Sequence, residues 1–224
     1  VYLDGEALDQ KHIINIGYMP EERGLYKSMK VGEQVIYLAR LKGLTKAEAK
    51  ERSAYWFNRL GMMDWWNKKI QELSKGQAQK VQFIVTVLHK PKLLIFDEPF
   101  SGFDPINATL IKDEILKLRD DGATILFSTH RMESVEQMCD HIALMHKSNK
   151  VLDGRLSDIK RAYRTNTFEV GIQTADDSVQ SLETLKKNVL ESASDDWQLN
   201  PAQFKTINEN DLKLQVKIPD GLSP

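Results

Sequence analysis

The sequence predicts an α/β fold with a mostly parallel sheet. The short apolar run LLIF (residues 93–96) is typical of a buried parallel strand, and ATILFS (residues 123–128) is predicted as the next strand. Between them, Asp104 is a good N-cap and Pro105 suits the first helical position, while Gly122 suits the end of that helix. A strand, a helix and a second strand in this order form the crossover unit from which parallel sheets are built.

Further strand and helix patterns continue this alternation along the chain. Thr45 and Glu48 form a capping box inside a helical region that covers residues 31–60. Trp65 and Trp66 follow this region, and the pair could either pack in the core or mark a docking surface. The other predicted elements are strands at residues 1–3, 13–18, 141–145 and 150–152, and a helix at residues 131–138.

The composition of the chain changes near Arg164. Beyond this point, residues 167–172 and 212–218 alternate between apolar and polar side chains, as half-buried strands do. A helical face lies between them, formed by Leu182, Leu185, Val189 and Leu190. We therefore predict a main domain over residues 1–164, with a helical subdomain at about 31–90, and a small α+β unit over residues 165–224 that is cut short at Pro224.

The composition indicates an ordinary globular protein. Hydrophobic residues make up 41% of the 224 residues and charged residues 28%, so the chain can bury a substantial core. Lys and Arg number 31 against 32 Asp and Glu, and this net charge of −1 argues against a nucleic-acid partner. The single cysteine, Cys139, excludes an intrachain disulfide and fits a reducing compartment. The sequence shows neither a membrane-spanning apolar run nor a signal peptide.

Polar side chains follow two strands of the predicted sheet. Asp97 and Glu98 come directly after LLIF, and His130 ends FSTH after the next strand. Because ligands of open α/β sheets bind at the carboxyl ends of the strands, we expect these three groups to converge. Two carboxylates and an imidazole suit metal-assisted hydrolysis, with one acid holding a divalent cation and the other acting as general base. Taken singly, each group could instead be a helix cap or a structural histidine.

The stretch LSKGQAQK predicts an anion site. It places Ser74 and Gly76 just ahead of a helical pattern of apolar residues. The first turn of a helix has free backbone N–H groups and the positive end of the helix dipole, and both favour an anion.

Four short motifs in a fixed order, LSKGQ, LIFDEP, SGFDP and STH, resemble those of the ATP-binding cassette (ABC) ATPases over roughly residues 1–156. The resemblance implies a P-loop NTPase-like core, incomplete here, with an inserted helical subdomain. It also implies a role for each motif residue: Ser74, Lys75, Gly76 and Gln77 in the signature motif, Asp97 as the magnesium-binding acid, Glu98 as the catalytic base, Ser101, Gly102 and Asp104 in the D-loop, and His130 as the switch histidine that senses the γ-phosphate.

The sequence departs from the family pattern at three places. IGYMPEERGLY falls on the Q-loop, and the glutamine position is Glu21, so a carboxylate would contact magnesium and water there. Lys75 stands where the family usually has glycine, which adds a cation near the phosphate. The phosphate loop GxxxxGK[ST] is missing, and the family places it upstream of VYLDG. Because the downstream motifs keep their chemical residues, we expect an N-terminal truncation rather than a degenerate enzyme.

The resemblance implies the nucleotide-binding subunit of an ABC exporter that uses ATP and Mg²⁺. The sequence segments EERGLY, LSKGQ and FSTHRME most resemble those of bacterial ATPases of the sodium- and drug-efflux type. The implied partners are a second copy or a paired ABC ATPase subunit, and a transmembrane permease that docks on residues 31–72; nucleic acid is not among them. The implied location is cytoplasmic, on the inner face of the membrane. Without a phosphate loop, we expect the chain alone to be inactive.

Two other classes of protein share these motifs. A soluble ABC protein acting on ribosomes or DNA would carry a second cassette behind a charged helical linker, or a long coiled-coil insertion, and this chain shows neither. A non-hydrolysing regulatory subunit would fit the missing phosphate loop, but the retained Glu98 and His130 argue against it.

Overall fold

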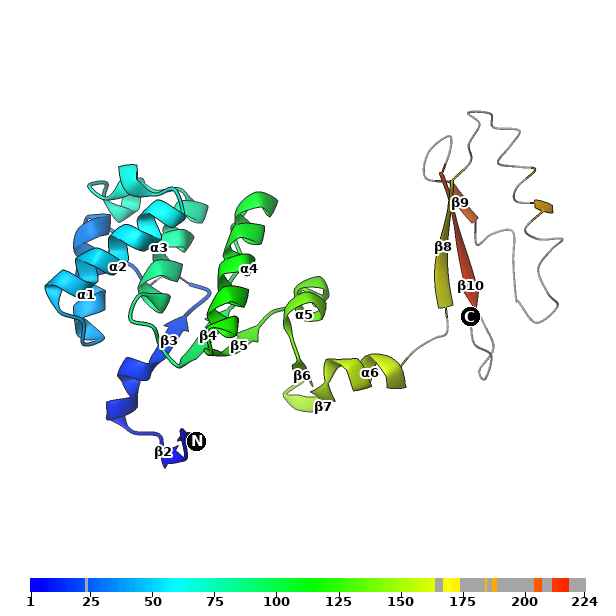
Figure 1. Ribbon diagram of the computed structural model, residues 1–224, viewed down its shortest axis with the longest axis horizontal. Helices are drawn as coiled ribbons and strands as arrows, with labels where there is room; N and C mark the ends of the chain where they lie inside the picture. Colours follow the sequence, from blue (N-terminus) through cyan, green and yellow to red (C-terminus); the bar gives the residue numbers. More distant parts are fainter. Residues whose placement is uncertain are drawn as a thin grey trace. The chain divides into compact units, whose positions relative to one another are not determined.

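The structure is a computed structural model that describes residues 1–22, 24–163, 167–173, 184, 187–188, 204–206 and 211–217 (Figure 1). The chain divides into two compact units, Val1–Met138 and Cys139–Pro224. Among the described residues, none of the helices combines the length and the apolarity that a bilayer crossing requires.

A parallel sheet organises the first unit. It has the strand order β3 (Ile16–Met19), β4 (Leu93–Asp97) and β5 (Thr124–Ser128), and both neighbouring pairs are parallel. Helices connect these strands in the crossover manner that parallel pairing demands (Figure 1). The predicted α/β class with a parallel sheet is therefore confirmed, and the LLIF and ATILFS runs are its adjacent strands.

Three helices of this unit, α2, α3 and α4, begin where their capping residues predict. The helices are α1 (Val31–Leu41), α2 (Lys46–Arg59), α3 (Lys75–Val87), α4 (Pro105–Asp120) and α5 (Met132–Met138), with short 3₁₀ helices at Met63–Trp65 (η2) and Ile70–Glu72 (η3). Thr45, Ser74 and Asp104 each accept a hydrogen bond from the backbone N–H three residues further on, at 3.2, 3.2 and 3.0 Å. These bonds satisfy N–H groups that the helix leaves unpaired, so the caps fix where α2, α3 and α4 start.

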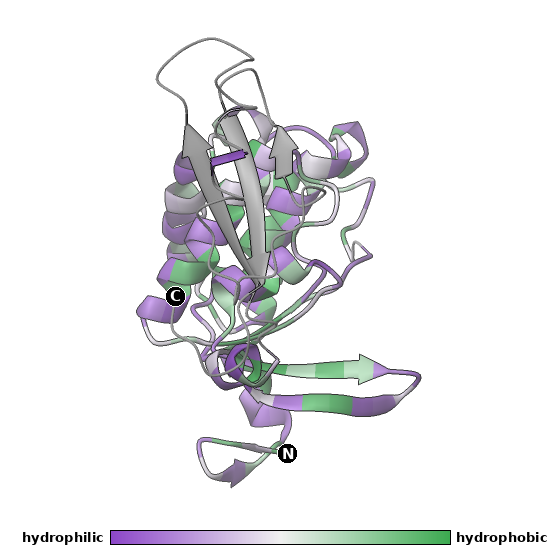
Figure 2. Cartoon of the chain, turned by 90° about the vertical axis from the view of Figure 1, so that its right-hand side faces the viewer, coloured by the Kyte–Doolittle hydropathy of each residue, from purple (hydrophilic) through white to green (hydrophobic). Residues whose placement is uncertain are grey.

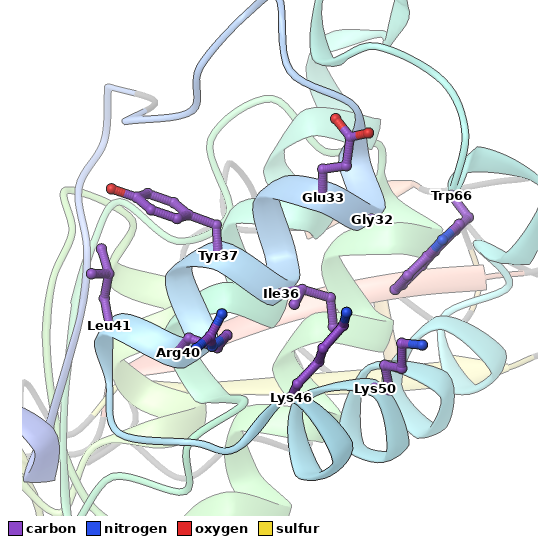
Figure 3. Close-up of a pocket in the computed structure, with 9 residues that line it drawn as sticks. All are labelled: Gly32, Glu33, Ile36, Tyr37, Arg40, Leu41, Lys46, Lys50 and Trp66. Atoms are coloured by element: carbon purple, nitrogen blue, oxygen red, sulfur yellow. The ribbon is translucent and has the colours of Figure 1, made fainter.

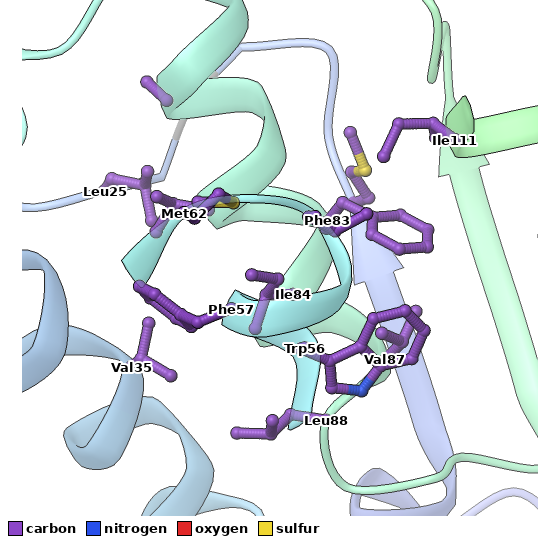
Figure 4. Packing of buried hydrophobic residues seen from close by; sticks show 14 of the residues in the cluster. Leu25, Val35, Trp56, Phe57, Met62, Phe83, Ile84, Val87, Leu88 and Ile111 are labelled. Carbon is purple, nitrogen blue, oxygen red and sulfur yellow. The ribbon is translucent and has the colours of Figure 1, made fainter. Parts of the chain in front are cut away.

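The core of the first unit lies among the helices and between α3 and one face of the sheet (Figure 4). Phe83 of α3 stacks on Phe96 of β4 with ring centroids 6.1 Å apart, and Trp56 of α2 meets Phe83 edge-on at 5.7 Å. Gly17 of β3 faces α3 so closely that a Cβ there would lie 2.5 Å from the carbonyl oxygen of Thr86. Close packing of this kind holds α3 firmly against the sheet.

The opposite face of the sheet carries an exposed apolar row. Tyr18, Ile95 and Leu126 are in register across β3, β4 and β5. Tyr18 is 55% exposed and Leu126 is 61% exposed, whereas their strand neighbours Met19 and Phe96 are fully buried. Because side chains alternate along a strand, Asp97 and Ser128 lie on this open face too, at its carboxyl edge.

The predicted strand over residues 13–18 is wrong in its first half. Residues Gln10–Asn15 form a 3₁₀ helix, η1, and the strand starts at Ile16. Local capping outweighs the apolar pattern here: Asp9 accepts a bond from Gln10 N at 2.5 Å, and Lys42 Nζ donates to the carbonyls of Ile13 and Ile16 at 2.9 Å each. Upstream, β1 (Tyr2–Leu3) and β2 (Glu6–Ala7) pair as a small antiparallel hairpin.

The second unit contains two antiparallel assemblies. Strands β6 (His141–His146) and β7 (Asn149–Arg155) form a hairpin in which apolar and polar stretches alternate (Figure 2), and α6 (Leu156–Ala162) follows. Strands β8 (Thr167–Gln173), β10 (Asp211–Lys217) and β9 (Phe204–Thr206) form a sheet in that order. Strands at both predicted positions are therefore confirmed. The helical face predicted at Leu182, Leu185, Val189 and Leu190 lies outside the described residues.

Candidate active site

The carboxyl ends of β4 and β5 bring the predicted acids and the histidine together. Parallel register places Asp97 opposite Ser128, and Ser128 Oγ donates a hydrogen bond to Asp97 Oδ1 at 2.5 Å. The backbone N–H of Glu98 donates to the carbonyl of Ser128 at 3.0 Å. These two bonds fix the end of one strand to the end of the next, so the side chains that follow are held in a defined relationship.

The Glu98 carboxylate is the centre of this cluster. Its Oε1 accepts bonds from His130 N at 2.8 Å and from His130 Nδ1 at 2.7 Å, and its Oε2 accepts from Thr129 Oγ1 at 3.1 Å. The Glu98 side chain is 15% exposed, whereas the His130 side chain is 83% exposed. The carboxylate is thus enclosed by three donors, and the imidazole is the member of the cluster that can move into solvent.

The backbone at Glu98 adopts an uncommon conformation. Its φ is +44°, in the left-handed region that non-glycine residues seldom occupy, and a turn follows in which Ser101 N bonds to Glu98 O at 3.0 Å. Strain of about 1–3 kcal/mol at one residue persists only where the surroundings enforce it, and such residues cluster at functional sites.

The LSKGQ segment forms the start of α3. Ser74 Oγ accepts from Gln77 N at 3.2 Å, and Ser74 N donates to Gln77 Oε1 at 2.9 Å, which makes a complete capping box. Gln77 therefore closes its own helix end. Ser74 and Lys75 are exposed, so the first turn is accessible from solvent.

The SGFDP segment lies against this turn. Gly102 has φ +83°, and a Cβ placed there would lie 2.8, 2.9 and 3.0 Å from Cε, Cδ and Cγ of Lys75. Asp104 caps α4, with Oδ1 accepting from Asn107 N at 3.0 Å and Oδ2 from Asn107 Nδ2 at 2.6 Å. These hydrogen bonds lower the pKa of Asp104, so its carboxylate is committed to the cap.

The predicted residues thus form two groups joined by one loop. Asp97, Glu98 and His130 meet at the strand ends, while the first turn of α3 meets Gly102. Ser101 lies in the loop between them. Glu21 lies two residues beyond β3 and is exposed, and within the described parts of the chain no hydrogen bond or ion pair joins it to Asp97 or Glu98.

The donor set bears on whether magnesium fits this site. In the part of the chain that the structure describes, no three His, Cys, Asp or Glu side chains gather into a metal cage. Protein-bound Mg²⁺ commonly uses one or two carboxylates together with substrate phosphates. Asp97, which is held by Ser128, fits a site in which one carboxylate and substrate phosphates bind Mg²⁺ together.

Sequence reasoning missed two polar residues of the cluster, Ser128 and Thr129. Ser128 holds Asp97 and Thr129 holds Glu98. The signal was present in FSTH, where every residue after the phenylalanine is polar and lies at the end of a strand or just beyond it.

The chain is similar to known ABC transporter ATP-binding proteins. A family model described as ABC transporter matches residues 1–101. An uncharacterised ABC transporter ATP-binding protein of Bacillus subtilis, YhaQ, is 54% identical over 153 residues, which cover 68% of this chain and 51% of YhaQ. Another, from Alkalihalophilus pseudofirmus, is 44% identical over 183 residues, which cover 82% of this chain and 68% of that protein.

A solved structure is similar as well. It is the structure of the ATP-binding subunit of an ABC transporter, and it matches with a TM-score of 0.64 and 29% identity, covering 68% of this chain and 64% of that one. The chain spans about half the length of YhaQ.

Proposed function

Because this chain belongs to the family of ABC transporter ATP-binding proteins, we propose that it is part of the ATPase subunit of a bacterial exporter. The whole protein would bind and hydrolyse Mg-ATP at the interface of two such subunits, and would couple that cycle to a membrane permease. Residues 1–164 would be the ATPase domain and residues 165–224 a small extension. The observation that carries the proposal is the contact of Glu98 with His130 at the carboxyl edge of the sheet.

The contact between Glu98 and His130 supports a different role for each residue of the cluster. Glu98 would act as general base toward a water molecule, and Thr129 would keep the carboxylate oriented. Hydrogen bonds to the ionised carboxylate disfavour its protonation, so losing one of them would make Glu98 a stronger base, and His130 is the most exposed of its partners. Its imidazole would turn from Glu98 toward the transferred phosphoryl group, so that ligand binding itself frees the base.

Asp97 would hold magnesium together with the nucleotide phosphates, and Ser128 would fix the orientation of that carboxylate. When bound, magnesium neutralises charge on the transferring phosphoryl group. The exposed first turn of α3, with Ser74, Lys75 and Gly76, would supply hydrogen-bond donors and positive charge to the nucleotide of a second subunit.

The row of exposed Tyr18, partly buried Ile95 and exposed Leu126 supports the proposal that a further segment of the whole protein covers this sheet face. An uncovered apolar row across a parallel sheet is unusual, because helices normally cover both faces. A phosphate-binding segment on this face would end beside Asp97, which shares it. The missing phosphate loop would then reach the catalytic edge.

A groove on the helical region fits the permease. It has a volume of about 600 Å³ and lies between α1, the start of α2 and Trp66 (Figure 3). Its apolar side chains are Ile36, Tyr37, Leu41 and Trp66, and its charged side chains are Arg40, Lys46, Lys50 and Glu33. Three cations against one acid favour an amphipathic permease helix that carries acidic residues. Such docking would hold the subunit at the inner face of the membrane.

A pair of measurements tests the function. The whole protein, purified with its native N-terminus, should hydrolyse Mg-ATP. Calorimetry of the present chain with Mg-ATP should give essentially no heat of binding, because the phosphate loop and its lysine are absent from the sequence. Micromolar binding by this chain would show that the phosphate site is misplaced, and a whole protein without ATPase activity would overturn the proposed function.

A further inference from the structure

The Lys75 side chain covers the loop that carries the candidate base. The three stem atoms Cγ, Cδ and Cε all lie within 3.0 Å of the position that a Cβ on Gly102 would occupy. The stem therefore fills the space that only a glycine leaves open. Long cationic side chains often bury the stem in this way while the charged end stays in water, and Lys75 as a whole is exposed.

A further backbone contact and an electrostatic interaction also link this loop to α3. A Cβ on Gly76 would lie 3.3 Å from the carbonyl oxygen of Gly102, so the two backbones approach closely. Lys80, one turn further along α3, is buried. Burial lowers its pKa, and the nearby charge of Asp104 partly opposes that shift. Helix α3 thus contacts the loop at its middle and influences it electrostatically at its end.

The same loop connects Gly102 to Glu98 through a short segment. Only three residues separate Glu98 from Gly102, and the middle one, Phe100, is buried with 3% exposure. Glu98 and Gly102 both have positive φ, and Ser101 N bonds back to Glu98 O. We therefore expect a displacement at Gly102 to shift the carboxylate of Glu98 as well.

We propose that Lys75 is a positioning residue for Glu98, acting through its methylene stem on Gly102. The inference rests on the proposed ATPase function for its catalytic consequence, whereas the packing contact stands by itself. This role explains why a lysine, and not only a positive charge, is useful in the LSKGQ segment. The methylene stem of Lys75, which belongs to α3, packs against the loop at Gly102.

The decisive comparison is between two variants of the whole protein that both lose the charge. Lys75→Ala removes the stem, and Lys75→Met keeps a stem of similar reach. We expect kcat of Lys75→Ala to fall roughly tenfold below that of Lys75→Met, since misplacement by a fraction of an ångström costs about that much. KM for ATP should be the same in both variants. Lys147→Ala, at an exposed lysine outside the site, the groove and residues 31–72, is the control for general effects.

Equal kcat values for Lys75→Ala and Lys75→Met would overturn the positioning role. A double-mutant cycle on the thermal unfolding midpoint tests the contact separately. Gly102→Ala strains the backbone in either background, but it meets the stem only when Lys75 is present. The midpoint should therefore drop less in the Lys75→Ala background. If the shift of the midpoint in the double variant equals the sum of the two single shifts, the contact between Lys75 and Gly102 is overturned. If the unsubstituted whole protein has no ATPase activity, only the proposed function is overturned.

Discussion

His130 Nδ1 lies 2.7 Å from Glu98 Oε1, and the backbone N–H of His130 bonds to the same oxygen at 2.8 Å. One residue thus engages the carboxylate through both its backbone and its side chain. In the proposed mechanism, the side-chain bond would be exchanged for a bond to a phosphate, while the backbone bond would remain.

The first prediction concerns Glu98 itself. In the whole protein, Glu98→Gln should retain ATP binding while hydrolysis slows by roughly 10²–10⁴-fold, the scale expected for loss of a general base. The amide keeps the size of the side chain but cannot accept the proton. Steady-state hydrolysis and nucleotide binding should both be measured. Glu133→Gln, at an exposed acid on α5, is the control, and a Glu98→Gln protein with near-normal turnover would show that the base lies elsewhere.

Much of this site could be predicted from the sequence because sheet geometry dictates it. Asp97 ends β4, Glu98 follows it and His130 comes two residues after β5, and neighbouring parallel strands end at one edge. The same reasoning could not find the contact of Lys75 with Gly102, since it depends on a loop with two positive φ values. Nor could it find η1, where the Asp9 cap and the distant Lys42 outweigh an apolar run. Contacts between residues far apart in sequence leave no local periodicity.

A second prediction concerns Glu114, a buried acid on α4. Arg59 Nε contacts its Oε2 at 2.6 Å and Lys117 Nζ its Oε1 at 3.0 Å. Burial by itself would raise the pKa of Glu114, but the hydrogen bonds from Arg59 and Lys117 outweigh it and lower the pKa. Arg59→Met should reduce the free energy of unfolding by about 1–3 kcal/mol, because Lys117 still offsets part of the buried charge.

Denaturant unfolding of the whole protein measures this effect, with Arg119→Met as a matched control at the exposed Asp120 pair on the same helix. The pH dependence has a defined sign. A lowered folded pKa gives stability that is present above the usual value of 4.5 and is lost as the pH falls through the folded pKa. The gap between wild type and Arg59→Met should therefore narrow in acid. A difference in the free energy of unfolding that grows as the pH falls would contradict the ion pair between Arg59 and Glu114.

A third prediction concerns His89, just after α3. Burial lowers its pKa to about 4, although the Ile16 carbonyl accepts a bond from Nε2 at 3.2 Å. The imidazole should be neutral at pH 7. Its contribution to stability is present above the unfolded value of 6.5 and is lost as the pH falls through about 4. NMR titration of the ring checks this directly, and a midpoint near 6.5 would refute it. Unfolding of His89→Gln should depend less on pH between these values.

The last prediction asks which ATP the LSKGQ segment serves. If the first turn of α3 closes over nucleotide bound to a second subunit, each site combines residues from two chains. One whole-protein variant would carry a disabled phosphate-loop lysine, and the other would carry Ser74→Arg. The arginine would fill the space before the exposed first turn and remove the hydroxyl that caps α3. Each homodimer should be nearly inactive, because both of its sites are broken.

Mixing the two variants separates the possibilities. In a mixed dimer with composite sites, both lesions fall in one site and the other site is intact, so ATPase activity should return. Should hydrolysis require two working sites, a purified mixed dimer should still bind one ATP per dimer in a closed site. If the segment served the nucleotide of its own chain, every subunit would stay broken and neither activity nor closed-site binding would return. Mixed dimers of two Ser74→Arg subunits with different tags control for the exchange itself, and they should remain inactive.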